Sequence, residues 1–541
     1  MMINSKSSGT YQNTNTAMLL LLIVFVLISI SSSAKVSLTL DEYLHFQYGL
    51  RVLNGNSTRL DDSSMPISAL NALPVNLASF LPEGLLKVVL GRFAVARLVT
   101  IIVSMLVAYL VFNWSRSLYG FIPAIFSLLL YVFDPNIIAH SQLVTTDLYI
   151  LGAVCLTFYR LWLFANQRSL KNGLLFLLAF GISQVIKYTA IALFPLCLIT
   201  LLIYDWHVFR DSFTATDKLK LFFKKYIGYI FATIVATVLI INVGFLFNRT
   251  FTRFGDYQFR SAPFLALQKF AVLRQIPVPV PYPYLDGLDW VINTEQSGNR
   301  YGNLYLLGQL SKQKGFAGYY FIASLLKVPI ASQIVVVTSL VVYLISKERN
   351  RNFLRNEVFL LVPIVFYTIY FNFFFNTQIG IRYYLVIFPL LYVFSGSLFI
   401  GWQGFPIVGK ALSVMLVVYL VASVLSYFPY YIPYFNEIVG DKTQTYKYLS
   451  DSNLDWGQSQ IYLDEYLSEH PDAVYSPNHI QTGTLVVGGS DLVGILENPD
   501  RYAWLRNHFE PVDTVAYTYF VYRVSPQEIT KLCVSADLCE K

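Results

Sequence analysis

The chain has 541 residues, of which 55% are hydrophobic and only 13% are charged, and its mean hydropathy is +0.52. Soluble globular domains carry roughly a quarter charged residues, so this composition excludes an ordinary soluble protein and indicates a chain that crosses a membrane many times. The formal net charge of +7 does not indicate nucleic-acid binding, because no basic, aromatic-rich soluble stretch accompanies it.

Apolar runs recur along most of the chain. A helix needs about 20 mainly apolar residues to span a bilayer. About eleven runs approach that length, near residues 17–33, 93–113, 119–133, 147–165, 173–186, 188–204, 226–247, 320–345, 357–375, 383–400 and 408–427. The sequence therefore predicts a polytopic α-helical membrane protein.

Basic residues predict the orientation, because short cytoplasmic loops retain Lys and Arg. With the N-terminus inside, the inner segments hold fourteen Lys and Arg, whereas the short outer connections hold two, Lys187 and Arg382. This asymmetry predicts a cytoplasmic N-terminus, and an odd number of spans then places the C-terminus outside. The first run, followed by SSSA, has a cleaved signal peptide as its alternative interpretation.

Three polar segments are too long for turns and fall on the outer side: 34–92, 248–319 and 428–541. In the last, TLVVGGSDLVGI and DTVAYTYFVYRV have the composition of strands, and SQIYLDEYLSEH has helical spacing. We therefore predict a transmembrane domain over 1–427 and a small extracytoplasmic α/β domain over 428–541. Cys533 and Cys539 fall in this tail, where an oxidising compartment would allow them to pair.

Charged residues begin directly after the first span, in LTLDEYLHFQYG (residues 38–49). A helix along the membrane interface would place Asp41 and His45 on one face, with Glu42 beside them. A carboxylate there can take a proton from an incoming hydroxyl or amine. The alternative is that both acids only cap and charge the helix N-terminus.

Further polar residues fall near the outer ends of other spans. DPNIIAHSQLVTTD holds His140 and Asp147 before the fourth span. Four cations stand in or beside apolar runs: Arg97, Lys187, Lys327 and Arg382. Each could snorkel to head groups, but several cations at one depth are typical of a site for a lipid phosphate.

A carboxylate base and a cationic cluster are what sugar transfer from a lipid phosphate requires. The base deprotonates the acceptor, and the cations stabilise the charge that grows on the departing phosphate. Because phosphate leaves readily, no general acid is needed, unlike in ordinary glycoside hydrolysis.

These motifs carry a family resemblance. The chain resembles the polyprenyl-phosphate-sugar-dependent membrane glycosyltransferases of the GT-C class. The resemblance rests on five stretches: DEYLHFQYG, DPNIIAHSQLVTTD, QVIKYTAIALFPL, SLLKVPI and IGIRYYLVIFPL. The branch is that of the protein O-mannosyltransferases and lipid A aminoarabinose transferases. PYFNEIVG and YLSDSNLDWGQ resemble a bacterial subgroup of this family.

The resemblance implies a GT-C-like fold and an inverting transfer on the outer face, from an undecaprenyl- or dolichyl-phosphate-linked monosaccharide to a glycan, lipid or protein. It implies that Asp41 is the catalytic carboxylate, that Glu42 is the second acid of the pair in the first outer loop, and that Asp147 is the acidic residue at the head of the fourth span. It also implies that no cofactor is needed, although His140 and Asp147 leave a divalent cation open. The chain departs from the eukaryotic protein mannosyltransferases in lacking their MIR repeats, so that route does not favour a protein acceptor.

Other interpretations remain. In SDSNLDWGQ, Asp451 and Asp455 beside Trp456 suit acceptor binding by hydrogen bonds and stacking, or simply a turn that caps the next helix. Asp41 and His45 have the spacing of two metal ligands, but no third ligand follows. The rival function is a transporter or flippase of a lipid-linked or anionic substrate, whose charges would gather near the bilayer midplane. The sugar, the acceptor, the oligomeric state and the role of the tail do not follow from the sequence.

Overall fold

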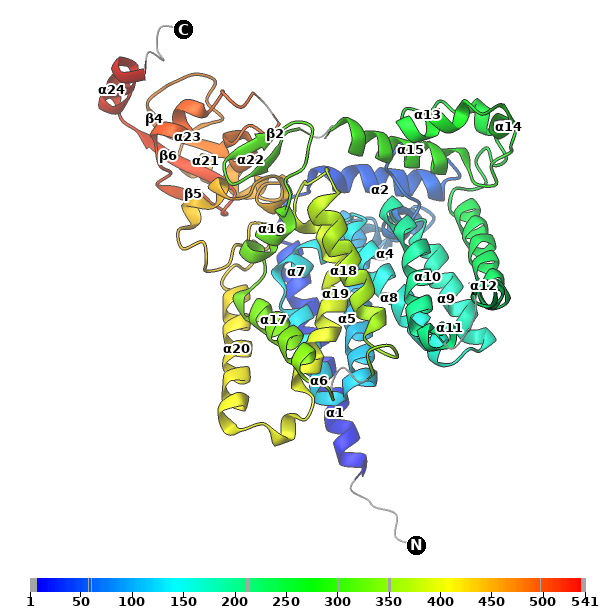
Figure 1. The fold of residues 1–541 in the computed structure, drawn as a ribbon. Coiled ribbons are helices and arrows are strands. Elements are labelled where there is room, and N and C mark those ends of the chain that lie inside the picture. Colours follow the sequence, from blue (N-terminus) through cyan, green and yellow to red (C-terminus); the bar gives the residue numbers. More distant parts are fainter. Residues whose placement is uncertain are drawn as a thin grey trace.

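The structure is a computed structural model that describes residues 7–56, 58–59, 61–210, 215–298, 302–348, 352–496 and 498–536. The predicted pairing of Cys533 with Cys539 cannot be followed, because Cys539 lies outside these residues. The described chain is mainly helical, and the helices form an elongated bundle with an outer layer across one end (Figure 1).

Six helical segments in the described ranges are long and apolar enough to cross a membrane. They lie in α1 (Ser7–Ser33), α5 (Phe93–Tyr119), α8 (Asp147–Asn166), α12 (Ala215–Gly244), the run Ile381–Phe399 (η4, α19 and η5) and α20 (Ile407–Leu425). A seventh candidate is the pair α6 (Phe121–Val132) and α7 (Pro135–Ser141), bent by 64°. Four shorter apolar segments complete the set: α9 (Leu170–Ser183), η1 with α10 (Tyr188–Tyr204), α17 (Ile330–Ile345) and α18 (Val358–Phe373).

Each predicted apolar run thus contains helix, which confirms the polytopic helical fold class, while the number of crossings, about eleven, stays a prediction. One predicted run breaks at a proline, and a second proline stands just after the end of another run. The run over 320–345 splits into α16 (Tyr319–Lys327) and α17, because Pro329 lacks the N–H that would continue the helix. The N-terminus of α7, which begins at Pro135, is capped by the Asp134 carboxylate. This carboxylate accepts hydrogen bonds from the amides of Asn136 and Ile137.

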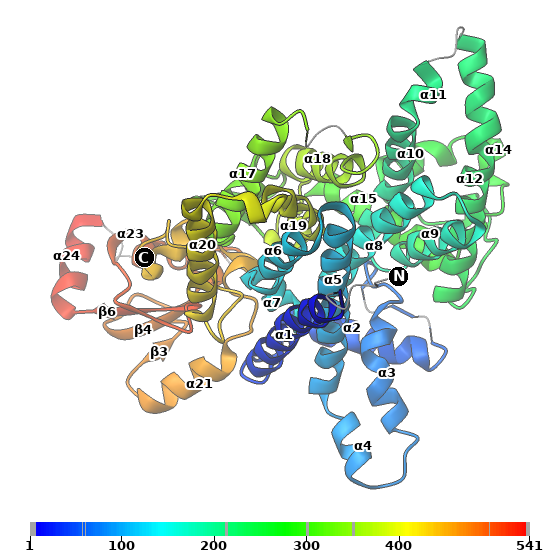
Figure 2. The same ribbon diagram turned by 90° about the horizontal axis from the view of Figure 1, so that it is seen from below.

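Burial separates central helices from peripheral ones. In the run Ile381–Phe399, 83% of the residues are buried, and in α8 72%, whereas the spans in α12 and α20 are only 17% buried. In Figure 1, α8 and α19 lie inside the bundle and α12 and α20 at its opposite edges, and Figure 2 shows the same bundle from below. The central pair therefore forms the core, and α12 and α20 face the lipid.

The outer layer begins with α2 (Leu40–Leu53), which lies across the end of the bundle under α15 (Tyr282–Ser297) (Figure 1). The stretch 38–49, considered as an interfacial helix from its sequence, is helical from Leu40 onward, and Gly49 lies against the backbone of Ser68, where a Cβ would collide. The remaining outer helices are α3 (Ser68–Ala78), α4 (Leu85–Leu90), α13 (Ala262–Gln268) and α14 (Ala271–Arg274). The hairpin of β1 (Leu304–Leu306) and β2 (Gln309–Ser311) follows α15.

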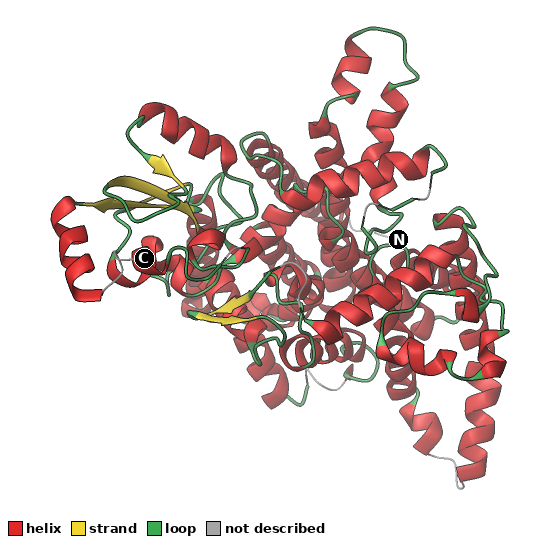
Figure 3. Cartoon of the chain, turned by 90° about the horizontal axis from the view of Figure 1, so that it is seen from above, coloured by secondary structure: helices red, strands yellow, loops and turns green. Residues whose placement is uncertain are grey.

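The tail forms the predicted small α/β unit. Its sheet has the order β3-β4-β6-β5, formed by Val474–Tyr475, Gly483–Gly488, Tyr519–Val524 and Asp513–Val515, and it is antiparallel except for the β3-β4 pair. Figure 3 shows these strands to one side of the helices. Around them lie α21 (Gln460–Glu469), α22 (Gly489–Leu492), α23 (Ala503–His508) and α24 (Pro526–Ala536).

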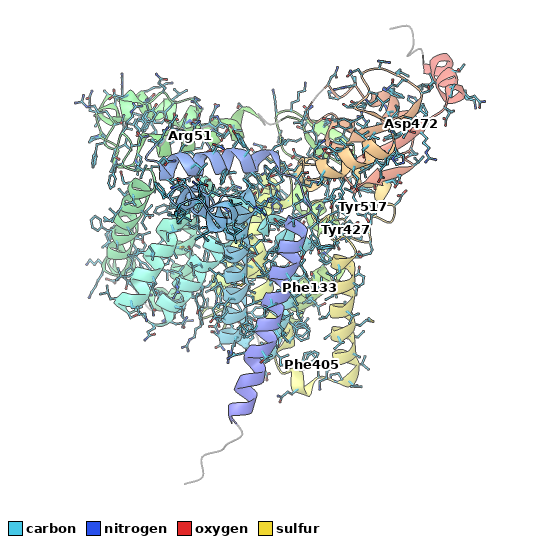
Figure 4. All side chains as sticks on the ribbon, turned by 180° about the vertical axis from the view of Figure 1, so that it is seen from behind. Arg51, Phe133, Phe405, Tyr427, Asp472 and Tyr517 are labelled. Atoms are coloured by element: carbon cyan, nitrogen blue, oxygen red, sulfur yellow. The ribbon has the colours of Figure 1, made fainter. Side chains whose placement is uncertain are left out.

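The tail is joined closely to the membrane helices. The ring centroids of Tyr427, after α20, and Tyr517, before β6, lie 4.9 Å apart, and both are labelled in Figure 4. The amide of Ser37 donates a hydrogen bond of 2.9 Å to the carbonyl oxygen of Gln458. The start of α1 and the tail lie at opposite ends of the bundle (Figure 1). The domain boundary at residue 427 stays a prediction.

Candidate active site

A cavity of about 340 Å³ lies between the bundle and the outer layer. Its walls come from the start of α2, the start of α8, residues 187–189, η4 (Ile381–Ile387) and the first part of the tail, and residues of α15 close another side. The volume is in the range of roughly 300–1,000 Å³ that ligand sites occupy.

The cavity holds a chain of alternating charges. Arg382 Nη1 lies 2.7 Å from Asp41 Oδ2 and 3.7 Å from Asp147 Oδ2. Lys187 Nζ lies 2.6 Å from Asp147 Oδ1. The Asp41 side chain is 34% exposed, while that of Asp147 is 3% exposed. Two carboxylates and two cations from four distant segments thus meet, with Asp41 the more accessible acid.

Aromatic rings hold both cations. Lys187 Nζ lies 3.9 Å from the centre of the Tyr383 ring, and the Arg382 guanidinium lies 4.3 Å from the Trp456 ring. Such contacts stabilise a cation without neutralising its charge. The two cations therefore keep their charge beside the rings and share it with the carboxylates of Asp41 and Asp147.

Local sequence explains where the charged groups stand. Asp41 falls in the first turn of α2, whose N-terminus is fixed by a capping box between Thr39 and Glu42. Asp147 opens α8, and Lys187 precedes η1. Arg382 follows Gly380, whose φ of 113° is in the region that favours glycine. Each group thus lies at the end of a helix that points to the cavity.

Glu42 and Arg97 do not lie in the cavity, contrary to the prediction of a catalytic neighbour and a phosphate ligand. Glu42 is fully buried and accepts hydrogen bonds from Arg97 Nε at 2.8 Å, Arg97 Nη2 at 2.6 Å and the Val144 amide at 3.0 Å. Arg97 also donates to three carbonyl groups of the segment after α1. The pair joins α2, α5 and the α7–α8 connection, so we assign it a structural role.

Lys327 is also placed away from the cavity. It is 1% exposed, and its Nζ donates hydrogen bonds of 2.6 Å to the carbonyl oxygens of Ile432 and Asn453. It therefore fixes the end of α16 to the tail, and the predicted contact with a phosphate has no support in its position.

For Lys327→Met we expect a lower thermal unfolding midpoint together with an unchanged KM for the donor, because two buried carbonyl groups lose their donor. Thermal unfolding and donor titration of the purified variant measure the two effects, with Lys312→Met on the exposed hairpin as a control. A raised donor KM in a variant of normal stability would return Lys327 to the binding site.

The two histidines differ in position. His45 lines the cavity, and its Nδ1 lies 3.2 Å from Ser68 Oγ. Burial lowers the pKa of His45 below its ordinary value of 6.5, so the neutral ring predominates at pH 7. His140 is buried behind the cavity, with its ring centroid 5.9 Å from that of Trp456. His140 therefore supports the wall and does not form it.

The tail contributes Asp451, Asp455 and Trp456 to the cavity. All three stand in the tail motif that the sequence offered for acceptor binding, and their role stays a prediction. Trp290 and Glu295 of α15 also line the cavity and carry no local signal in the sequence. Among the described residues no group of three or more His, Cys, Asp or Glu is arranged to hold a metal ion.

Asp455 gives a prediction about pH. Burial raises its pKa from 3.8 to about 6, and the nearby Asp491 carboxylate adds to the shift. The folded protein thus binds this proton more tightly than the unfolded chain does, so the contribution of Asp455 to stability falls as the pH rises from about 4 to about 6.

We therefore expect Asp455→Asn to gain thermal stability over the parent protein above pH 6, and to lose that advantage progressively as the pH falls toward 4. Unfolding midpoints measured across this range check it, with the exposed Asp464→Asn as the control. A difference between variant and parent that stays constant with pH would contradict the assignment.

The fold makes the chain a multi-pass integral membrane protein, and its cavity brings carboxylates and cations together at one end of the helices. The family model described as dolichyl-phosphate-mannose-protein mannosyltransferase matches residues 76–241. This stretch runs from α3 to α12 and contains Asp147 and Lys187. The match confirms the predicted resemblance to membrane glycosyltransferases, while the roles of the individual residues stay predictions.

Solved structures show weaker likenesses. The apo oligosaccharyltransferase of Archaeoglobus fulgidus is 11% identical, with 76% of this chain and 54% of that chain covered and a TM-score of 0.46. AglB from the same organism, in complex with an inhibitory peptide and a dolichol-phosphate, is 12% identical. The match covers 94% of this chain and 74% of that chain, with a TM-score of 0.46. ArnT from Cupriavidus metallidurans, bound to undecaprenyl phosphate, is 14% identical, with 94% and 98% covered and a TM-score of 0.29. No curated relative matches the sequence.

Proposed function

We propose that the protein transfers a monosaccharide from a polyprenyl-phosphate-linked donor to an acceptor on the extracytoplasmic face of the membrane. The observation that carries this proposal is the meeting of Asp41 with Arg382, 2.7 Å apart although 341 residues separate them in the chain. A possible base and a possible phosphate ligand thereby share one cavity, as sugar transfer from a lipid phosphate requires.

The reaction follows from these groups. The Asp41 carboxylate takes the proton of the acceptor hydroxyl, whose oxygen attacks the anomeric carbon of the donor. The new bond to this carbon forms as its bond to the phosphate oxygen breaks, so the configuration inverts. Polyprenyl phosphate leaves with the bonding electrons, and Arg382 and Lys187 stabilise its added negative charge.

Donor binding would change the state of Asp41. Arg382 Nη1 lies 2.7 Å from Asp41 Oδ2, so the guanidinium and the carboxylate are engaged with each other. The phosphate of the lipid-linked sugar would compete with Asp41 for the guanidinium N–H groups of Arg382. We infer that the donor binds first and frees Asp41 to accept the proton, so steady-state kinetics should show an ordered mechanism.

The orientation belongs to the same proposal. The start of α1 lies at the opposite end of the bundle from α2 and the tail (Figure 1), whose residues line the cavity, and the segments predicted to be cytoplasmic are the ones rich in Lys and Arg in the sequence. Both observations support a cytoplasmic N-terminus, with the cavity and the tail outside.

The direct test uses the full-length protein in nanodiscs with undecaprenyl-phosphate and dolichyl-phosphate donors carrying radiolabelled mannose or aminoarabinose. Release of free polyprenyl phosphate in the presence of total cell-envelope acceptors supports the proposal. Mass spectrometry of surface glycans, lipids and glycoproteins from cells with and without the gene then identifies sugar and acceptor. If none of these donors is consumed and surface glycosylation is unchanged, the proposal fails.

For Arg382→Gln we expect a raised KM for the donor and a kcat lowered by roughly 10²–10³-fold, because the guanidinium contacts the phosphate more strongly as negative charge develops. Arg382→Lys should recover part of kcat, since Lys keeps the charge but not the bidentate geometry. Arg51→Gln, at a half-buried position of α2 that does not line the cavity, serves as the control.

A further inference from the structure

A second hollow, larger than the catalytic cavity, opens between α9, α10 and α12. Its volume is about 520 Å³, and most of its wall is apolar; Phe176, Phe180, Phe194, Leu198, Leu201 and Ile230 form much of it. None of the residues that line it lines the cavity of Asp41. We refer to it as the lateral crevice.

The lateral crevice lies on the lipid-facing edge of the protein. Its outer wall is α12, whose apolar span is only 17% buried, and α12 lies at the edge of the bundle (Figure 1). An unfilled apolar hollow forfeits the dispersion contacts of its wall. In a bilayer the flexible apolar chains that surround α12 supply those contacts.

One end of the crevice is positively charged. Arg168 lines it, and Arg168 Nη2 lies 2.7 Å from Asp205 Oδ2, while Lys225 Nζ lies 3.0 Å from Asp205 Oδ1. The single buried carboxylate of Asp205 therefore forms ion pairs with two cations, which leaves one positive charge in excess. Lys171 and Lys224, exposed on α9 and α12, add further positive charge at this end.

Rings and the carboxylate hold Arg168 in place. Its guanidinium lies 5.8 Å from the centre of the Phe164 ring and 5.6 Å from that of Tyr229. The side chain is nonetheless 26% exposed, so it retains an accessible face at the mouth of the crevice. An arginine with this setting can bind a phosphate by two parallel hydrogen bonds.

We propose that the lateral crevice binds an anionic glycerophospholipid of the leaflet on the side of α1, with an acyl chain between α9, α10 and α12 and its phosphate at Arg168. Basic pockets between membrane helices on the cytoplasmic side are suited to anionic head groups. The site is separate from sugar transfer and does not depend on the proposed function.

The test uses the full-length protein in nanodiscs that contain phosphatidylglycerol or phosphatidylcholine with the same photoreactive acyl chain. Crosslinks mapped by mass spectrometry are expected on the residues that line the crevice, with roughly fivefold more label from phosphatidylglycerol. The preference should shrink as the salt concentration rises, because the head-group contact is electrostatic.

Matched variants separate the two parts of the site. Ala232→Trp fills the crevice and should abolish its labelling, whereas Val235→Trp, at a lipid-facing position of the same helix, should not. Arg168→Gln should reduce labelling by phosphatidylglycerol to the level of phosphatidylcholine, and Lys410→Gln, at the start of α20, should leave the preference intact.

Equal labelling by both lipids at every salt concentration would overturn the head-group assignment. Labelling that survives Ala232→Trp would overturn the crevice itself. Displacement of the label by undecaprenyl phosphate but not by unlabelled phosphatidylglycerol would show that the occupant is a polyprenyl carrier, and would also overturn the proposal. The salt titration and the crosslink map use the unaltered protein, so they remain decisive if Arg168→Gln fails to fold.

Discussion

Replacing Asp41 with Asn is expected to lower kcat by roughly 10²–10⁴-fold, the range that a positioned general base contributes. The amide cannot accept the proton of the acceptor hydroxyl, although its size is nearly that of the carboxylate. The fold should persist, because the Asp41 side chain is one-third exposed and its single ion pair is at the edge of the cavity. Release of polyprenyl phosphate and the thermal unfolding midpoint measure the two effects.

The control for this variant is Asp62→Asn. Asp62 also forms ion pairs with arginines in the outer layer, but it does not line the cavity, so its removal should leave kcat within a factor of two. An Asp41→Asn protein with normal turnover would remove Asp41 from the role of base. Loss of donor binding together with turnover would instead indicate that Asp41 only positions Arg382.

Replacing Arg97 with Met is expected to destabilise the protein by about 3–5 kcal/mol, because it leaves the carboxylate of Glu42 buried without its partner. The double variant Glu42→Gln, Arg97→Met should recover part of this loss, because no buried charge then remains. Unfolding midpoints in detergent and the yield of folded protein report the effect.

The comparison is with the exposed pair of Glu83 and Lys87, whose atoms lie 2.6 Å apart and whose Glu83 side chain is 87% exposed. Lys87→Met should leave stability unchanged, because solvent already screens that pair. If Arg97→Met were as stable as the parent protein but failed to bind the donor, Arg97 would return to the phosphate site from which its position excludes it.

The helices could be predicted because membrane spans carry their signal locally, as apolar runs of sufficient length. The breaks were less visible. Pro329 divides the run over 320–345 after Lys327, and the 64° bend before Pro135 joins the run over 119–133 to a short helix that was not predicted as part of it. The strands at 483–488 and 519–524 followed from their β-branched and aromatic content, but their order in the sheet depends on pairing between distant segments, which local sequence does not contain.

The site shows the same limit. Asp41 and Glu42 are neighbours in the sequence, yet a helix turns about 100° per residue, so one carboxylate reaches the cavity and the other the protein interior. Arg97, Lys327 and Lys187 all looked alike, as cations in apolar runs. Their partners distinguish them: a glutamate 55 residues away, two carbonyl groups of the tail, and Asp147 at the cavity.

Trp290 and Glu295 were not predicted as site residues for the same reason. They stand in the long outer segments, where polar and aromatic residues are common, and only the folded chain brings them to one cavity. Tyr383 beside Arg382 had the clearest signal that was overlooked, since an aromatic residue next to an embedded cation can hold it in place.

The walls of the catalytic cavity also have a consequence for biosynthesis. Residues of the segments 451–456 and 490–496, near the end of the chain, form one side of it, and the Trp456 carbonyl oxygen accepts a hydrogen bond of 3.3 Å from the amide of Leu40, the residue before Asp41. A ribosome-bound chain that has inserted its helices still lacks that side. Under the proposed function, we therefore expect catalytic competence to arise only after export and docking of residues 451–496, and a truncated product left in the bilayer to be unable to consume lipid-linked sugar.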